Sequence, residues 1–324
     1  MGCAGLVLAS IVGLLSPLLS HLLGDSSGAL EWLVDLIANW QWLFLLILIC
    51  STAFIAFVDR RWAMLILVAP LPLLTAGGAA PFMQGQLSLN DPAFSIASAN
   101  VYFRNQDVTP LARWLEKERP DVVVLLEVSP DFAKELPGLQ SYPHRHVLAQ
   151  RDAYGLAILS RHPLVQVHVV RDANGIPLIQ AKVRWKESII GLAALHPMWP
   201  QALEQHVIRN RTLQSVTPAV TDEHLPSIVA GDLNATPWSN ALSGLQERGW
   251  QRATGLTPTW PAFLRGWLGV PIDHVLVNCH WAVASSIVGP TIGSDHLPVL
   301  VKLAPDALAG RNWGSSRCSS PMVS

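Results

Sequence analysis

Two polar strand endings constrain the fold of this chain more than any other feature. The apolar run Ile228–Ala230 leads into Gly231–Asn234, which reads Gly-Asp-Leu-Asn, and further along Gly293–His296 reads Gly-Ser-Asp-His. A short apolar run bounded by such turn residues is typical of a buried strand. Strand ends that carry carboxylates, an amide and an imidazole suit a hard cation and the phosphate that the cation holds. The sequence therefore predicts a buried sheet with a polar site at its edge.

Three apolar runs precede this part of the chain and account for its mean hydropathy of +0.33. They cover Cys3–Leu23, Trp40–Val58 and Trp62–Ala80. A helix of about 19 residues rises about 28 Å, close to the thickness of a bilayer core. Three such runs exceed what a globular core uses, so we expect three transmembrane helices within residues 1–82 rather than a buried hairpin. The first run could also be a cleaved signal peptide, but its lack of a basic start favours an uncleaved anchor.

The charges between the runs predict the orientation. Arg60 and Arg61 separate the second run from the third, whereas the segment after the first run carries only Asp25, Glu31 and Asp35. Short loops rich in Lys and Arg stay in the cytoplasm. Three crossings from a cytoplasmic N-terminus then place the rest of the chain outside. We expect a multi-pass protein of the cell (inner) membrane with an extracytoplasmic domain.

The chain beyond the membrane segment has the pattern of a layered α/β domain. A polar linker, residues 83–92, leads into a domain that we place at 93–305, and residues 306–324 form a tail expected to be disordered. Several strands are apolar throughout and few helices separate them, which indicates a sandwich of buried sheets. The predicted strands are Phe94–Val101, Asp121–Val128, Gly155–Ser160, Val165–Val170, Leu178–Trp185, Ser188–Leu195, Ser227–Ala230, Asp273–Val277 and Val299–Leu303, with helices at Thr109–Glu118 and Pro200–Val220.

Polar residues able to carry chemistry lie at the ends of these strands or just beyond them. Such positions suit a functional site, because loops held by a rigid scaffold carry function. No run rich in Lys or Arg accompanies them, so the electrostatic footprint of a dedicated nucleic-acid binder is missing. The candidate site residues are Asn100, Glu127, His196, Asp232, Asn234, Asp273, Asp295 and His296.

In the order and spacing of these motifs, the chain resembles the endonuclease/exonuclease/phosphatase superfamily, which has the DNase I-like fold. The resemblance extends from about Phe94 to Leu303. It implies an α/β fold, a four-layer sandwich of two mainly antiparallel β-sheets flanked by helices, preceded here by three transmembrane helices. The apolar segment ahead of the domain is similar to that of a membrane-anchored bacterial branch that includes proteins linked to glycopeptide-antibiotic resistance.

A divalent metal site is expected around Glu127. Mg²⁺ prefers oxygen ligands and keeps several waters, so one or two protein carboxylates suffice to hold it. The resemblance adds Asn100 and Asp295 to this site, and Asn105 is a nearby rival of Asn100. The expected cofactor is Mg²⁺, with Mn²⁺ as the alternative.

The remaining site residues are expected to carry the catalysis. Asp232 and Asn234 lie two positions apart after a strand, so in extended backbone both face the same side. The resemblance implies that Asp232 polarises or deprotonates the attacking water and that Asn234 donates to a phosphoryl oxygen. It also implies that His296 contacts the phosphate or acts as the base, that Asp273 orients His296, and that His196 protonates the leaving oxygen. Which of Asp232 and His296 is the general base stays open.

We therefore expect a membrane-anchored, Mg²⁺-dependent hydrolase of phosphoric esters, a phosphodiesterase or phosphatase. Its expected partners are the lipid bilayer and a lipid-linked or envelope phosphate outside the cytoplasm. The apolar loop Phe263–Val270 could lie against a bilayer, in a core or in a dimer contact. The alternatives are an extracytoplasmic nuclease, although nucleic acid is not favoured, and an inactive binding module that confers antibiotic resistance. No feature of the sequence indicates an oligomeric state.

Overall fold

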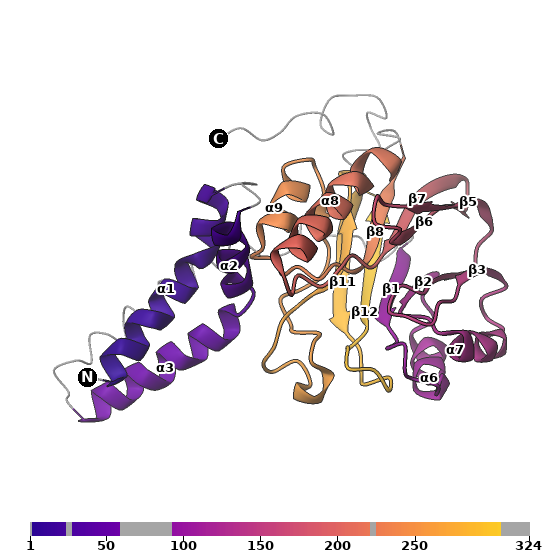
Figure 1. Ribbon diagram of the computed structural model, residues 1–324. Helices are drawn as coiled ribbons and strands as arrows, with labels where there is room; N and C mark the ends of the chain where they lie inside the picture. Colours follow the sequence, from indigo (N-terminus) through magenta and orange to yellow (C-terminus); the bar gives the residue numbers. More distant parts are fainter. Residues whose placement is uncertain (1, 24–27, 59–92, 221–224, 306–324) are drawn as a thin grey trace.

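The computed structural model describes residues 2–23, 28–58, 93–220 and 225–305. In this part of the chain, three helices precede a domain built on two six-stranded sheets (Figure 1). The third apolar run, the linker at 83–92 and the tail at 306–324 lie outside the described residues. The division of the chain into anchor, linker, domain and tail stays a prediction.

The first sheet has the strand order β11-β12-β1-β2-β4-β3. Strands β1 and β2 run parallel, and every other neighbouring pair in this sheet is antiparallel. Its strands are β1 (Phe94–Asn100), β2 (Val122–Leu126), β3 (His144–Leu148), β4 (Leu156–Ser160), β11 (Trp281–Val288) and β12 (Val299–Pro305).

The second sheet has the strand order β5-β6-β7-β8-β10-β9, and only β7 and β8 are parallel among its described pairs. Its strands are β5 (Leu164–Arg171), β6 (Pro177–Trp185), β7 (Ser188–Leu195), β8 (Ser227–Asp232), β9 (Gln251–Arg252) and β10 (Asp273–Val277). The prediction of two mainly antiparallel sheets is confirmed.

Three apolar cores separate four layers. Side chains alternate along each strand, so Phe94 and Ile96 of β1 join the core between the sheets while Ala97 and Ala99 face the helices outside the first sheet. A third core lies between the second sheet and its own helices. The outer helices are α6 (Thr109–Glu118) and α7 (Pro130–Glu135) on the first sheet, and α8 (Leu203–Val220) and α9 (Asn240–Gln246) on the second; short 3₁₀ turns η2 and η3 occupy Leu136–Gly138 and Ala262–Leu264.

Two apolar helices, α1 (Gly2–Leu23) and α3 (Gln41–Val58), pack on each other as an antiparallel hairpin that extends away from the domain (Figure 1). The segments Cys3–Leu23 and Gln41–Val58 are long and apolar enough to cross a membrane. The residues that join them, expected to be a loop, instead form helix α2 (Ala29–Ala38), which lies against the domain.

The sequence also did not predict β3 and β11. Both are outer strands of the first sheet; no side chain of β3 is fully buried, and in β11 only Trp281 and Val283 are. Polar residues in β3 and the half-exposed side of β11 leave no continuous apolar run of the kind by which the central strands were predicted.

Candidate active site

The strand pairing brings the predicted site residues to one end of the sandwich. Because β1 and β2 are parallel, Asn100 at the end of β1 lies beside Glu127, which follows β2. The parallel pair β7 and β8 likewise places His196 near Asp232. Strand β10 runs antiparallel to β8 with Asp273 directly opposite Asp232. The polar groups gather here because the sheets place these strand ends together.

The buried carboxylate of Asp232 is the centre of the site. Its Oδ2 lies 3.3 Å from Nε2 of His196 and 3.6 Å from Nε2 of His296. The same oxygen accepts a hydrogen bond from Nδ2 of Asn100 at 3.2 Å. Its Oδ1 accepts from the backbone N–H of Asn234 at 3.0 Å. Four of the predicted residues therefore address one carboxylate.

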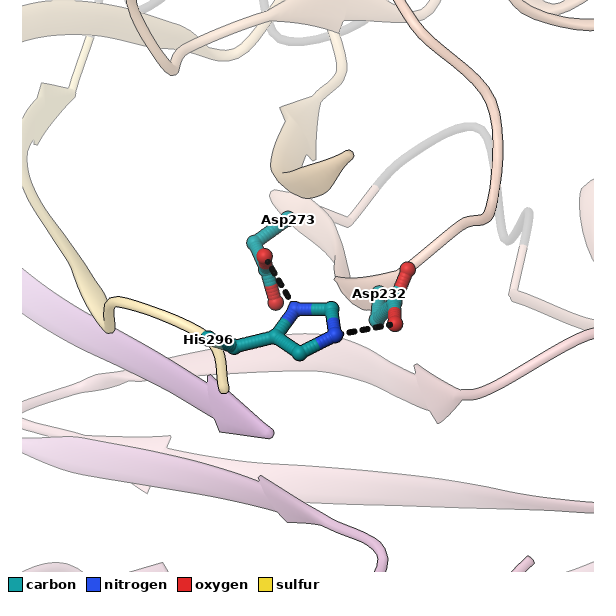
Figure 2. A group of neighbouring side chains, drawn as sticks. All are labelled: Asp232, Asp273 and His296. Carbon is teal, nitrogen blue, oxygen red and sulfur yellow. Dashed lines mark hydrogen bonds and ion pairs between the residues drawn. The ribbon is translucent and has the colours of Figure 1, made fainter. Parts of the chain in front are cut away.

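His296 lies between two carboxylates (Figure 2). Its Nδ1 is 2.9 Å from Oδ2 of Asp273, and its Nε2 faces Asp232. Both acids and the imidazole are buried. The backbone N–H of Asp273 donates to the hydroxyl of Thr259, while Oδ1 of Asp273 is buried with no hydrogen-bond partner in the described part of the chain. This contact places Asp273 where it can orient His296, and that role stays a prediction.

The charges of the group are set by mutual contact. Burial alone would raise the pKa of Asp232, but His296, His196 and the backbone N–H of Asn234 lower that pKa to about 2. Burial alone would lower the pKa of His296, but the carboxylates of Asp273 and Asp232 raise it to about 10. The pKa of His196 is raised because Asp232 outweighs its burial. At neutral pH Asp232 is ionised and His296 carries a proton on each nitrogen.

Glu127 and Asn100 form the neighbouring part of the site. Glu127 is half-buried and has a left-handed backbone with φ of 60°. Such a conformation is uncommon for a residue with a long side chain and is enriched at functional sites. Its Oε1 accepts from Nδ2 of Asn100 at 2.9 Å, and its Oε2 accepts from the backbone N–H of Phe103 at 3.0 Å. Asn105, the rival candidate, instead accepts from the backbone N–H of Asp107 in a turn.

His196 and Asn234 contact each other next to Asp232. Nδ1 of His196 is 2.9 Å from the carbonyl oxygen of Ala153, which directs Nε2 into the site. Asn234 has φ of 49°, and its Nδ2 lies 3.2 Å from Nε2 of His196 and donates to the carbonyl oxygen of Pro197 at 3.0 Å. These contacts hold both side chains in place.

Asp295 lies apart from the buried group. Its side chain is exposed, and its Oδ2 accepts from the indole N–H of Trp260 at 3.2 Å. Among the described contacts, its carboxylate makes no hydrogen bond or ion pair with Glu127 or Asn100. Its expected part in metal binding stays a prediction, as do the individual roles of the other site residues.

Two groups of acidic residues lie where a cation could bind. Ligand atoms of Asp232, Asp273 and His296 lie within 4.8 Å of one another. Both nitrogens of His296 face carboxylates, however, one through a hydrogen bond to Asp273 and one through an ion pair with Asp232, so the row has no free imidazole lone pair. Glu127 is only half-buried and lies next to Asn100 and the carboxylate of Asp232, so it offers the oxygen-rich surroundings that a hard divalent ion prefers. An acidic site that fits a divalent metal is therefore present.

Two glycines allow the close approach of the site strands. A Cβ on Gly231 would lie 1.9 Å from the carbonyl oxygen of Leu195, and one on Gly155 would lie 2.0 Å from that of Val128. Both obstacles are backbone atoms, which cannot move away as a flexible side chain can. Gly231 thus keeps the end of β8 against the end of β7, where Asp232 meets the residue that follows Leu195.

Several buried residues that support the site were not predicted from the sequence. Nη1 of Arg209 on α8 donates to the carbonyl oxygen of Asn234 at 2.9 Å. His274 lies 2.9 Å from the carbonyl oxygen of Ala235, and burial lowers its pKa to about 3, so it is neutral. In the sequence, only its position directly after Asp273 marks His274 as a residue of the site. Nothing in the sequence marks Arg209, because it lies on a helix far from the motifs.

Comparison with known proteins agrees with this geometry. Residues 97–296 match the model of the Endonuclease/Exonuclease/phosphatase family. No curated protein matches the chain in sequence.

Solved structures share the fold at low sequence identity. An endonuclease/exonuclease/phosphatase from Beutenbergia cavernae is 20% identical, with a TM-score of 0.55 over 66% of this chain and 72% of that one. A protein of the same family from Bacteroides thetaiotaomicron is 16% identical, with a TM-score of 0.55 over 67% and 99% of the two chains. D. rerio TDP2, solved with a single-strand DNA product, is 17% identical, with a TM-score of 0.55 over 66% and 99%. At these identities the likeness establishes the fold.

The contact at Gly231 predicts a substitution effect. Gly231→Ala places a methyl group against the Leu195 carbonyl and should lower the free energy of unfolding by about 1–3 kcal/mol. Gly244→Ala on α9 is the matched control, since nothing lies within 4 Å of its added Cβ; it should stabilise by about 0.5–1 kcal/mol. Thermal unfolding of both variants checks this, and equal stability of the two would contradict it.

The raised pKa of His296 predicts a pH dependence of stability. The pKa of His296 rises from 6.5 in the unfolded chain to about 10 in the folded chain. The bound proton therefore stabilises the folded chain fully below pH 6.5, and this stabilisation is lost as the pH rises towards about 10. The unfolding temperature of the metal-free chain should therefore fall between pH 6.5 and pH 10, and fall less steeply in His296→Gln. Parallel slopes for the two proteins would show that His296 is not the titrating group.

Proposed function

This chain belongs to the endonuclease/exonuclease/phosphatase family, which makes it a metal-dependent phosphoric ester hydrolase, and we propose that it acts on a lipid-linked phosphate at the outer surface of the cell membrane. The observation that carries the catalytic part is the row Asp273–His296–Asp232, with His196 next to the same carboxylate oxygen of Asp232. It places an ionised carboxylate between two imidazoles.

In this row the carboxylates and the imidazoles have different chemical roles in hydrolysis. Each nitrogen of His296 faces a carboxylate, so the ring is a donor and a cation rather than a base. Asp232 is then the group that polarises the attacking water. His296 and Asn234 contact phosphoryl oxygens, and His196 gives its proton to the leaving oxygen.

Glu127 and Asn100, with Asp295 at the exposed side, would hold one divalent cation. We propose Mg²⁺, with Mn²⁺ as the alternative. When bound, the ion neutralises charge on the phosphoryl oxygens. Glu127 is half-buried, so a carboxylate here would leave room for water to complete the coordination of the ion.

The exposure of the first helices supports membrane anchoring. A core helix of a soluble protein is mostly buried, whereas only 33% and 22% of the apolar segments in α1 and α3 are buried. Helix α2 supports anchoring more strongly. Its charged residues Glu31 and Asp35 are buried, whereas its apolar residues Leu30, Leu33 and Ile37 are exposed. An apolar outer face on a helix is stable against hydrocarbon and costly against water.

The position of α2 also supports the orientation. This helix joins the two apolar helices and contacts the domain, so the domain lies on the side of the membrane where α2 connects them. Arg60 and Arg61 follow the far end of α3 and therefore belong to the opposite side, the cytoplasm by the positive-inside rule. The domain is then extracytoplasmic. The third apolar run, Trp62–Ala80, supplies the return crossing in this proposal.

Exposed aromatic side chains favour a lipid-linked substrate over a nucleic acid. Phe263 and Trp267 are 79% and 85% exposed in the loop whose Ala262 N–H bonds the carbonyl of Asp295. Trp199, which is 57% exposed, lies three residues after His196. Aromatic side chains next to a phosphate site on an anchored domain suit the bilayer interface.

The function is tested with the full chain in detergent or lipid vesicles. Hydrolysis of a prenyl pyrophosphate or a phospholipid should require Mg²⁺ and cease with a chelator. Asp232→Asn and His296→Gln should each lower kcat by about 10²- to 10⁴-fold. His168→Gln, at an exposed histidine of β5, should leave kcat unchanged. Rapid cleavage of DNA with no turnover of any lipid phosphate would replace the lipid proposal by the nuclease alternative.

The orientation is tested separately in intact cells. Ser141 is exposed on the domain, so Ser141→Cys in a chain without its four native cysteines should react with an impermeant thiol reagent before lysis. A cysteine placed at Arg61 should react only after lysis. The reverse pattern would put the domain in the cytoplasm and end the extracytoplasmic proposal.

A further inference from the structure

Helix α2 is bound to the domain through buried charges. Asp35 is 0% exposed; its Oδ2 accepts from Nη2 of Arg209 at 2.9 Å and its Oδ1 from the hydroxyl of Ser239 at 2.6 Å. Glu31 is 1% exposed, and its Oε2 lies 2.6 Å from Nε2 of His206. Burying a charge is costly unless it is paired and hydrogen-bonded, so these contacts fix α2 in one position.

These contacts continue into the catalytic loop, residues 233–239. Arg209, held by Asp35 on one side, donates from Nη1 to the carbonyl oxygen of Asn234 at 2.9 Å. Asn39, at the C-terminal end of α2, accepts from the backbone N–H of Thr236 at 3.2 Å. Ser239, bonded to Asp35, also caps helix α9. The loop is thus held from α2 at its beginning, middle and end.

The catalytic loop needs such support because of its backbone. Asn234 has a positive φ of 49°, and its N–H must point at Asp232 while its side chain reaches Pro197. A left-handed backbone outside glycine persists where the surroundings fix it. The contact from Arg209 to the Asn234 carbonyl oxygen helps to fix this peptide.

We propose that α2 is a positioning element of the active site. Asp35 acts through Arg209, and Asn39 acts directly, to hold the backbone of the catalytic loop and thereby Asn234 and Asp232. The inference deepens the proposed function and rests on it, since it concerns the same site. Helix α2, between the two apolar helices, is then a structural part of the active site. Catalysis therefore depends on the position of the helical hairpin relative to the domain.

Asn39 is the best residue for a test, because Asp35→Ala would leave Arg209 buried without its partner and could unfold the interface. Asn39→Ala removes the acceptor of the Thr236 N–H and also the donor to the carbonyl oxygen of Asp35. Asn39→Asp lacks the same donor but keeps an acceptor oxygen, so the two variants differ in the contact with the loop. Trp32→Phe is the matched control: it removes an α2 hydrogen bond to the carbonyl of Pro200 and leaves the catalytic loop untouched.

Hydrogen exchange of the full chain in detergent gives a readout that needs no substrate. In Asn39→Ala the amides of residues 233–236, 238 and 239 should exchange about tenfold faster, the effect of losing one hydrogen bond. The central strands should keep their protection, Asn39→Asp should restore the loop, and Trp32→Phe should leave it unchanged. Unaltered loop exchange in Asn39→Ala, or faster exchange throughout the domain in all variants, would overturn the positioning role.

Kinetics of the same proteins completes the test. Per folded molecule, kcat of Asn39→Ala should fall about tenfold with KM nearly constant, and Asn39→Asp should recover it. A normal kcat in Asn39→Ala would overturn the inference while the proposed function stands. If the wild-type chain hydrolyses no phosphoric ester although loop exchange responds as expected, the proposed function fails and the contact between α2 and the loop remains.

Discussion

A carboxylate at the meeting point of two sheets needs partners for both of its oxygens, and Asp232 obtains them from every part of the site. The first sheet supplies Asn100, the end of β7 leads to His196, the loop before β12 supplies His296, and its own turn supplies the N–H of Asn234. A buried charge left without such partners would be costly. The two sheets must therefore pack in the one relative position that brings these partners to Asp232, and the same packing assembles the site.

The partners of Asp232 are themselves held by a second set of contacts. Nδ1 of His296 is bonded to Asp273, and Nδ1 of His196 to the carbonyl oxygen of Ala153, so both rings present Nε2 to the same carboxylate. This arrangement is formed by contacts within the chain itself. Groups already oriented towards developing charge need no reorganisation during the reaction, which is the main source of electrostatic stabilisation in enzymes. The low pKa of Asp232 and the high pKa of His296 are consequences of this arrangement.

The parts that the sequence predicted are those in which one local pattern determines the outcome. Central strands are apolar on both faces, so β2 and β8 were found from composition alone, and the polar residues at their ends had to meet once the sheets formed. Outer strands such as β11 lack this signal because one side faces water. Arg209 could not be predicted, because nothing local distinguishes a helical arginine that supports Asn234 from one that faces solvent. Its role depends on residues far away in the chain.

Helix α2 escaped prediction for a different physical reason. Glu31 and Asp35 lie one helical turn apart, and amphipathic patterns are usually interpreted with water outside, so charges between two apolar runs indicate an exposed loop. Here the outside of the helix is apolar and the charged side faces the protein. Such an inverted helix is stable only if the protein supplies counter-charges on one side and the surroundings on the other are not water. Arg209 supplies the counter-charge of Asp35, and Nε2 of His206 contacts the carboxylate of Glu31. The position of α2 beside two helices of membrane-spanning length is how the second condition can be met.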